Sequence, residues 1–375
     1  MDFLTPDSFA GFAAELAVAA GEGRPVRIIG GGSKPWAAPA SDDALVLGTE
    51  RFDWTVEHVP GDMTAVFAAG VPFARAQAEL AVSGQRMALD PPLGLNDRAT
   101  IGGVVATGDS GPLAHRYGTP RDQVLGLTVA LSDGTIARSG SRVIKNVAGY
   151  DLPKLYAGSF GTLGGILAVG VRLRALPRAT ATILGGAADP DALAAAVAHL
   201  ARAPLELEAL DVAWRSGRGG VLAQVAGTVA TRRADEVAFA MSDSGLGTID
   251  IADEDSEFWE RQRGLQRSDT RVVVLVTGPR GALPSVLRLA DACDATMVGR
   301  AALGVSYLTV DPEQVAPLRA ALPAGMHAVV LDRPGDVEID TWGAVDSPSV
   351  GLMRAVKAQF DPAGVCNPGL MVGGI

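Results

Sequence analysis

Two glycine-rich segments carry the residue types that bind phosphate groups. The first, Ile28–Trp36, reads IIGGGSKPW and continues an apolar strand pattern. Its three glycines let the backbone approach a ligand and point successive N–H groups at one anion, while Ser33 and Lys34 add a hydroxyl and a cation. The spacing fits neither a P-loop nor a Gly-x-Gly-x-x-Gly loop. Taken alone, the segment predicts a cluster of turn glycines with Lys34 in solvent.

The second segment, Asp90–Gly111, reads DPPLGLNDRATIGGVVATGDSG. Its proline pair at positions 91 and 92 predicts an extended entry. Thr100 can cap a short helix over the residues that follow, and the first turn of that helix would present free N–H groups to an anion. Glycines would weaken this helix if it served only for packing. Two such segments in one stretch of chain indicate a ligand with a diphosphate group.

A third stretch, Ile144–Ile166, contains five glycines between positions 149 and 165. The part YDLPKLYAG predicts a short helix that buries Leu152 and Leu155 and ends at Gly158. A tight loop then leads into an apolar strand whose alternate residues face the core. Glycine before a buried strand lets the backbone approach a flat or phosphorylated group, so this stretch also belongs to the predicted ligand site.

The composition indicates a globular chain and excludes several classes of partner. The 375 residues are 48% hydrophobic and 20% charged, which allows a sizeable core and two domains. The formal net charge of -10 argues against nucleic acid, because phosphate binding by polymers needs a basic face. Two distant cysteines, Cys293 and Cys366, are too few for an iron–sulfur cluster or a zinc site, so we expect ordinary thiols and no metal.

The N-terminal MDFLTPDSFAGF lacks the basic start of a signal peptide. The best apolar run, GGILAVGVRLRAL, is interrupted by arginines and is too short to cross a bilayer. These features predict a cytoplasmic protein that is at most peripheral on the inner face of a membrane.

The texture of the chain changes twice along its length. From Val26 to Pro177 glycines and strand patterns dominate, and Ser132–Gly134 between two strand patterns predicts a hairpin. From about 178 to 345 alanine-rich helices alternate with strands, which predicts one sheet with helices on one face. The last stretch predicts a helix near Gly351–Phe360 and a tail rich in proline and glycine. We find no internal repeat in the sequence.

The order of four motifs resembles the vanillyl-alcohol-oxidase-type family, whose FAD-binding domains are called PCMH-type. The motifs are GGGSK, TIGGVVATGDSGPLAHRYG, KNVAGYDLPKLYAGSFGTLGGI and, near the C-terminus, FDPAGVCNPG. Within the family the chain most resembles the FAD-binding E subunits of bacterial glycolate oxidases. The resemblance implies an α+β fold with a PCMH-type FAD-binding domain at 1–177, built from two α/β subdomains at about 1–57 and 58–177. It further implies an α+β cap domain at 178–345 and a C-terminal segment, 346–375, that returns to the FAD-binding domain.

The same resemblance implies FAD as the cofactor and assigns residues to it. The diphosphate would be lined by Gly30, Gly31, Gly32, Ser33 and Lys34. The second wall would be formed by Thr100, Ile101, Gly102, Gly103 and Thr107, with Ser110 and Gly111 near the flavin ring. Pro91 is also assigned to cofactor binding. Gly161 and Ile166 would lie against the ribityl or adenine end, and Asn367 would reach the edge of the flavin ring. A turn glycine or a helix cap is the alternative for each, and we favour it for Gly149 and Gly158.

The chain also departs from the family at places that bear on its chemistry. Relatives that oxidise 2-hydroxy acids carry an H-x-G-D-G-N-x-H stretch, whereas the four histidines here are isolated, at positions 58, 115, 199 and 327. Phe160 replaces the family's acidic loop residue and Leu370 replaces the lysine after Asn-Pro-Gly. The first loop offers no histidine for attachment, so we expect FAD to be non-covalent. The chain therefore lacks an obvious general base, with His115 as the one histidine worth testing.

These departures predict a flavin subunit that passes electrons and is not active alone. A second FAD-binding subunit would oxidise a small 2-hydroxy acid such as glycolate, and an iron–sulfur subunit would take the electrons. Arg116 and Arg121 could hold a carboxylate, although surface ion pairs or contacts with a partner subunit are the favoured interpretation. Two alternatives remain open: a redox-inactive FAD-binding scaffold, and a free-standing FAD-dependent oxidoreductase.

Overall fold

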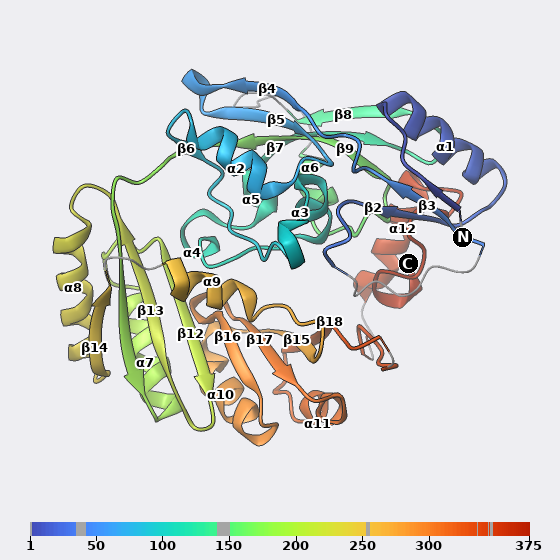
Figure 1. Ribbon diagram of the computed structural model, residues 1–375. Coiled ribbons are helices and arrows are strands. Elements are labelled where there is room, and N and C mark those ends of the chain that lie inside the picture. The colour runs from blue at the N-terminus through green and yellow to red at the C-terminus, as the bar shows by residue number, and fades with distance from the viewer. Residues whose placement is uncertain are drawn as a thin grey trace. The chain divides into compact units, whose positions relative to one another are not determined.

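The computed structural model describes residues 2–34, 43–140, 151–252, 256–335, 337–343, 345 and 348–375. The backbone divides into two compact units, each of which combines helices with strands, and this confirms the α+β fold class (Figure 1). The first unit comprises Met1–Ser110, Gly118–Leu176 and Ala344–Ile375. The second comprises Gly111–Tyr117 and Pro177–Gly343. The segment Gly111–Tyr117, which the sequence placed with the FAD-binding part, thus groups with the second unit.

The first unit begins with a small parallel sheet covered by one helix. The strand order is β1-β3-β2. The strands are β1 (Asp2–Leu4), β2 (Val26–Ile29) and β3 (Leu45–Gly48), and the helix is α1 (Phe9–Gly21). The side chain of Ser8 caps α1 by accepting a hydrogen bond from the Gly11 N–H at 3.2 Å. The helix buries Phe12 and Leu16, which lie one turn apart on its inner face.

An antiparallel five-stranded sheet follows, in the order β4-β5-β9-β7-β8. Its strands are β4 (Thr55–Val59), β5 (Thr64–Ala68), β7 (Val124–Ala130), β8 (Ile136–Gly140) and β9 (Gly165–Arg172). The predicted hairpin at Ser132–Gly134 is confirmed, because β7 and β8 pair across it and the Asp133 carboxylate accepts from the Thr135 N–H at 2.8 Å. A short ladder joins β6 (Gln85–Arg86) to β10 (Arg174–Ala175).

Short helices and one C-terminal helix complete the first unit. They are α2 (Phe73–Ala81), α3 (Ile101–Thr107), α5 (Pro120–Gln123), α6 (Pro153–Tyr156) and α12 (Pro348–Phe360). The expected burial of Leu155 is wrong, because α6 buries Pro153 and Tyr156 and leaves Leu155 37% exposed. Pro153 and Tyr156 are three residues apart and so share the inner face of this short helix, whereas Leu155 lies on another face.

One hydrophobic core joins both sheets of the first unit, and it explains a glycine that the sequence assigned to the ligand site. Phe12, Leu47, Phe67 and Leu167 are all fully buried in this core. A β-carbon at Gly165 would lie 2.4 Å from the ring of Phe12. The flat group that Gly165 admits is therefore the ring of Phe12 on α1.

The second unit is one antiparallel eight-stranded sheet, ordered β14-β11-β13-β12-β16-β17-β15-β18. Its first half contains β11 (Thr180–Ala187), α7 (Pro190–Leu200), β12 (Ala209–Arg215), β13 (Arg218–Ala226), α8 (Ala230–Asp243) and β14 (Gly247–Ala252). Its second half contains β15 (Val272–Thr277), α10 (Leu283–Ala292), β16 (Thr296–Arg300), β17 (Val305–Val310), α11 (Val315–Ala320) and β18 (His327–Asp332). Two further helices, α4 (Ala114–Tyr117) and α9 (Ser256–Gly264), belong to this unit.

The two halves of this sheet are structural repeats, although the sequence shows no internal repeat. Each half runs β-α-β-β-α-β with its four strands in the same spatial order, the ferredoxin-like arrangement. The halves join through β12 and β16, where Val212 pairs with Gly299 and Trp214 with Met297. The repeat is not visible in the sequence, because the two halves share only the alternation of buried and exposed residues. Many different apolar residues can occupy the buried positions.

The two faces of the sheet differ. The large core of the second unit is formed by alternate strand residues together with α7, α8, α10 and α11. Trp259 of α9 packs on the other face against Ala209 and Leu222. The predicted sheet with helices on one face is therefore confirmed, with α9 as an addition on the other face.

Candidate flavin-binding site

The first glycine loop lies directly on the segment that precedes α3. A β-carbon at Gly31 would fall 1.8 Å from the carbonyl oxygen of Arg98, and one at Gly30 would fall 2.4 Å from Oγ1 of Thr100. Gly94 in turn touches Ser33, where a β-carbon would approach the Ser33 carbonyl oxygen at 2.9 Å. The structure thus brings together the two segments that the sequence assigned to one ligand. Glycine is required at position 31 by the backbone of Arg98 and at position 30 by the side chain of Thr100.

The loop still offers hydrogen-bond donors. Within the described part of the chain, no group accepts a hydrogen bond from the N–H of Gly31, Gly32 or Ser33. Gly32 is exposed and has the left-handed φ of 63°. Consecutive N–H groups without an acceptor, one of them at a left-handed residue, form the kind of concave site that binds a phosphate. This arrangement fits the diphosphate of FAD.

The start of α3 differs from the expectation in one respect. Thr100 caps α3 as predicted, with Oγ1 accepting from the Gly103 N–H at 3.2 Å. The expected free N–H groups are absent from its first turn, because the Ile101 N–H donates to Val71 and the Gly102 N–H donates to Ala69. The segment after β5 lies against the start of α3 and takes these donors. The prediction that this helix presents free N–H groups to an anion is therefore wrong.

Two glycines of α3 have opposite surroundings. A β-carbon at Gly102 would lie 2.6 Å from the β-carbon of Ala69, so Gly102 is needed for packing. A β-carbon at Gly103 would meet only Thr100 Oγ1, at 3.1 Å, among the described residues. The hydroxyl of Thr107 donates to the Gly103 carbonyl at 2.9 Å. Gly103 therefore faces a space in which a ligand could lie.

Lys34 is a buried cation. Its Nζ lies 3.0 Å from Oδ2 of Asp109, and the two side chains are 9% and 15% exposed. The interpretation of Lys34 as a solvated side chain is wrong. The ion pair links the first glycine loop to the residues that follow α3, and it gives the predicted phosphate site its one buried ammonium group among the described residues.

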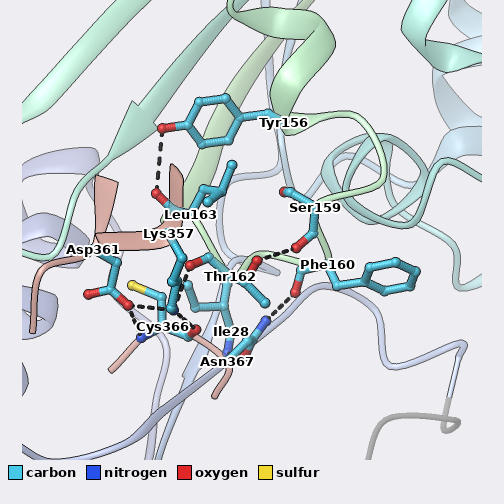
Figure 2. Close-up of polar contacts among 10 residues, drawn as sticks. All are labelled: Ile28, Tyr156, Ser159, Phe160, Thr162, Leu163, Lys357, Asp361, Cys366 and Asn367. Atoms are coloured by element: carbon cyan, nitrogen blue, oxygen red, sulfur yellow. Dashed lines mark hydrogen bonds and ion pairs between the residues drawn. The ribbon is translucent and has the colours of Figure 1, made fainter. Parts of the chain in front are cut away.

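The third glycine stretch is fastened to the C-terminal tail by Asn367 (Figure 2). The side-chain oxygen of Asn367 accepts from the Ile28 N–H at 2.7 Å, and its nitrogen donates to the Phe160 carbonyl at 2.6 Å. A β-carbon at Gly161 would lie 2.6 Å from that nitrogen. Asn367 is only 3% exposed and thus joins β2, the loop at Phe160 and the tail. Its contact with the flavin ring stays a prediction.

A second polar cluster beside Asn367 connects the third glycine stretch to the C-terminal segment (Figure 2). Lys357 Nζ donates to the carbonyls of Thr162 and Cys366, both at 2.7 Å, and pairs with Asp361 at 2.6 Å. The Asp361 carboxylate also accepts from the Cys366 N–H at 2.8 Å. Burial alone would raise the pKa of Asp361, but the hydrogen bonds from Lys357 and Cys366 outweigh it and lower that pKa. The sequence analysis missed this cluster, although Lys357 and Asp361 have the spacing of a helical ion pair.

Burial and then the charge of Asp361 raise the pKa of the Cys366 thiol. Cys366 is fully buried and Cys293 is buried as well. Both are free thiols, and neither has the exposure or the lowered pKa that a reactive cysteine needs.

The other predicted residues divide between the core and the loops. Pro91 is buried, and Ile101 and Ile166 are 2% and 5% exposed, so all three lie in the core. Ser110 is 8% exposed. It ends the segment Met1–Ser110 of the first unit, whereas Gly111 belongs to the second unit. Lys145, Asn146 and Gly149 lie outside the described residues.

No hydrogen bond joins two of the four histidines, all of which are described. His58 Nε2 contacts Gln85 Oε1 at 2.8 Å in the first unit, and His199 and His327 are exposed. Burial, followed by the charges of Arg280 and Arg116, lowers the pKa of His115. His115 is thus a weaker base than a solvent-exposed histidine.

The segment with His115 is anchored within the second unit. Tyr117 donates to the Glu208 carboxylate, with oxygen–oxygen distances of 2.9 and 2.8 Å, and Arg116 lies 3.4 Å from it. Arg116 also donates to the Glu206 carbonyl at 2.8 Å. Arg116 therefore forms a local ion pair with Glu208, which agrees with the favoured interpretation of Arg116 as a member of a surface ion pair.

Two buried charged residues lie at the junction of the two repeats. Asp211 on β12 and Arg300 on β16 are 1% and 2% exposed, next to the paired residues Val212 and Gly299. Gln262 donates to Asp211 at 3.1 Å. Burial raises the pKa of Asp211 to about 6, and Arg300 and Gln262 oppose the shift. A lone Asp in an apolar strand pattern is the one sequence signal that could have located this site.

Two negative findings hold for the described residues. No group of three or more histidine, cysteine, aspartate or glutamate side chains there is arranged to hold a metal ion. No described helix has both the length and the apolar character needed to span a bilayer.

Family models match two parts of the chain. Residues 3–140 match the FAD binding domain, and residues 344–371 match the C-terminal domain of FAD linked oxidases. Glycolate oxidase subunit GlcE of Escherichia coli is 28% identical over 362 residues, which cover 92% of each chain. An uncharacterized FAD-linked oxidoreductase of Mycobacterium tuberculosis is 29% identical over 96% of this chain and 88% of its own length.

Further matches concern a shorter region and the fold. Glycolate oxidase subunit GlcD of Bacillus subtilis is 40% identical over 116 residues, 30% of this chain and 25% of that protein. The solved structure of an alkyldihydroxyacetonephosphate synthase aligns with a TM-score of 0.72 at 15% identity, covering 98% of this chain and 76% of that one. The matched FAD binding domain contains the first glycine loop, whose N–H groups at Gly31, Gly32 and Ser33 have no acceptor among the described residues. The chain thus contains an FAD binding domain and the C-terminal domain of FAD linked oxidases, which supports a PCMH-type FAD-binding fold, and its cofactor is FAD.

Proposed function

We propose that the chain is the FAD-binding subunit of a multisubunit 2-hydroxy-acid oxidase or dehydrogenase that converts glycolate to glyoxylate. A second FAD-binding subunit oxidises the substrate, and an iron–sulfur subunit accepts the electrons. The similarity to two differently named glycolate oxidase subunits, GlcE over nearly the whole chain and GlcD over a shorter region, supports an assembly of this kind.

In this proposal the first glycine loop binds the diphosphate of FAD. The N–H groups of Gly31, Gly32 and Ser33 donate to it, and Lys34 contributes a positive charge. Gly103 leaves room beside the second wall. When bound, FAD supplies the capacity to accept two electrons and release them one at a time. Asn367 and Lys357 keep the loop at Phe160 and the tail in place beneath the site.

One observation carries the division of labour between subunits. Oxidation of a 2-hydroxy acid requires a base for the hydroxyl proton, and such a base contributes roughly 10²–10⁴-fold to the rate. All four histidines of the chain are described; they are isolated in the sequence, and no hydrogen bond joins two of them. His115 is the one partly buried histidine in the second unit, and burial, followed by the charges of Arg280 and Arg116, lowers its pKa and weakens it as a base.

We further propose that FAD is held without a covalent bond. Covalent attachment needs a reactive side chain in the site, usually histidine or cysteine. The first loop continues as Ser33, Lys34 and Pro35, and both cysteines are buried free thiols. The binding energy must then come from the loop donors, Lys34 and the surfaces beside the flavin.

Co-purification tests the proposal against its alternatives. The tagged chain is isolated from its native host, and flavin, iron and protein are counted in the isolated complex. A complex with more than one flavin per copy of this chain, together with iron, is the expected result. A chain that is isolated alone, with one flavin and its own turnover of glycolate, would establish the free-standing oxidoreductase. A complex in which this chain's flavin is never reduced would establish the scaffold.

A further inference from the structure

The ion pair between Lys34 and Asp109 places a carboxylate beside the proposed phosphate site. The two groups are 3.0 Å apart, and both side chains are largely buried. A further cation lies near, since a β-carbon built at Gly32 would be 3.9 Å from a guanidinium nitrogen of Arg98. Asp109 is therefore the acidic group in direct contact with the cation that the diphosphate needs.

The positive charge of Lys34 explains why a carboxylate lies beside it. A buried ammonium group without FAD requires a counter-ion, because an unpaired charge in that position is costly. Asp109 provides it and so stabilises the loop when the cofactor is absent. A diphosphate brings negative charge of its own to the same cation, and two like charges close together repel.

We propose that Asp109 is an internal counter-ion that competes with the FAD diphosphate for Lys34. Asp109 stabilises the empty loop and weakens cofactor binding. This inference rests on the proposed function in one respect: the loop Gly30–Lys34 must hold the diphosphate. It adds a residue, Asp109, that sets the affinity for FAD without being part of the predicted site.

The decisive variant is Asp109→Asn, which keeps the shape of the side chain and removes its charge. Fluorescence titration of the flavin-free full chain with FAD should give a dissociation constant about tenfold lower than that of the unmutated chain. The melting temperature of the flavin-free protein should fall, and saturating FAD should raise it by more than in the unmutated chain. An unchanged or higher dissociation constant overturns the proposal.

A matched control separates charge at the site from the loss of any buried ion pair. Arg267 and Asp332 form such a pair in the second unit, with a nitrogen–oxygen distance of 2.7 Å and exposures of 12% and 2%. Asp332→Asn should lower the melting temperature and leave the affinity for FAD unchanged. A similar gain of affinity in Asp332→Asn would show that the effect at Asp109 is not local and would overturn the proposal.

Two further arms locate the effect. Lys34→Met should raise the dissociation constant at least tenfold, because Asp109 then faces the diphosphate uncompensated, and adding Asp109→Asn should recover most of that loss. ADP, which carries the diphosphate without the flavin ring, should bind Asp109→Asn about tenfold more tightly as well. A gain for FAD without one for ADP would place Asp109 against the flavin ring and overturn the proposal.

The arms also distinguish failure of the inference from failure of the proposed function. An unmutated chain that binds no FAD contradicts the function, whereas FAD binding with no response to Asp109→Asn contradicts only the inference. If Asp109→Asn is recovered only with FAD bound, its release rate on dilution replaces the titration. Slower release than in the unmutated chain supports the proposal, and equal or faster release overturns it. If it is not recovered, Asp109→Ala is measured in the same way.

Discussion

Gly31 lies so close to Arg98 that a β-carbon on the glycine would fall 1.8 Å from the arginine's carbonyl oxygen. The two glycine-rich segments of the first unit therefore touch through their backbones at this point. The glycines of the site have separate purposes: some permit this contact, and others leave donors or space for FAD.

Gly31→Ala and Gly103→Val should separate these purposes. Gly31→Ala forces the two segments apart and should lower the free energy of unfolding by about 2–4 kcal/mol. Gly103→Val projects into the space left for the cofactor. It should raise the FAD dissociation constant at least tenfold and change the free energy of unfolding by less than about 1–2 kcal/mol. Denaturation and FAD titration of both variants check this, and retention of stoichiometric FAD by Gly103→Val after dialysis would make Gly103 a packing residue.

Asn367→Ala should destabilise the first unit and weaken FAD binding together. The substitution leaves the Ile28 N–H and the Phe160 carbonyl without their buried partner, at a cost of about 2–4 kcal/mol. Asn96 supplies the control, because it is exposed and its left-handed φ of 55° is close to the 43° of Asn367. Asn96→Ala changes the same backbone preference but removes no buried contact of this kind. Equal melting temperatures for the two variants would contradict the role given to Asn367.

The buried Asp211 should make stability depend on pH. Its pKa is raised from the ordinary 3.8 to about 6, so the folded state favours its protonated form. The resulting stabilisation is fully present below about pH 4 and is lost as the pH rises through 6, by up to roughly 3 kcal/mol. Denaturant unfolding of the unmutated chain and of Asp211→Asn, at several pH values from 4 to 7.5, measures the difference. A difference that stays constant over this range would show that the pKa of Asp211 is not raised.

FAD should be released completely when the protein is precipitated with acid. The first glycine loop, Gly30–Trp36, contains no histidine, and both cysteines are buried free thiols. All flavin absorbance should appear in the supernatant. Yellow colour that stays in the washed pellet would show a covalent bond and contradict the prediction.

Much of this architecture could be predicted from the sequence because it depends on local patterns. The hairpin at Ser132–Gly134 follows from turn chemistry, and the cap of α3 at Thr100 follows from its side chain. The use of each glycine could not be predicted, because it depends on what lies opposite in space. Gly165 admits the ring of Phe12, which is more than a hundred residues away in the chain.

Polar contacts between residues far apart in the chain could not be predicted from the sequence either. The N–H groups at the start of α3 are taken by Ala69 and Val71, which a helix-capping rule cannot reveal. The pairing of Asp109 with Lys34 joins residues from two different loops. The two halves of the second unit share a spatial order of strands, which becomes visible only when the strands are paired.

The central claim is that this chain holds FAD but does not oxidise the 2-hydroxy acid by itself. The test is anaerobic mixing of the FAD-loaded chain with excess glycolate or D-lactate while the flavin absorbance near 450 nm is followed on the order of minutes. The account predicts that the isolated chain keeps its oxidised spectrum, and that the assembled complex, mixed in the same way, loses it. Rapid bleaching of the isolated chain would contradict the account and move the oxidation into this subunit, with His115 as the first residue to replace.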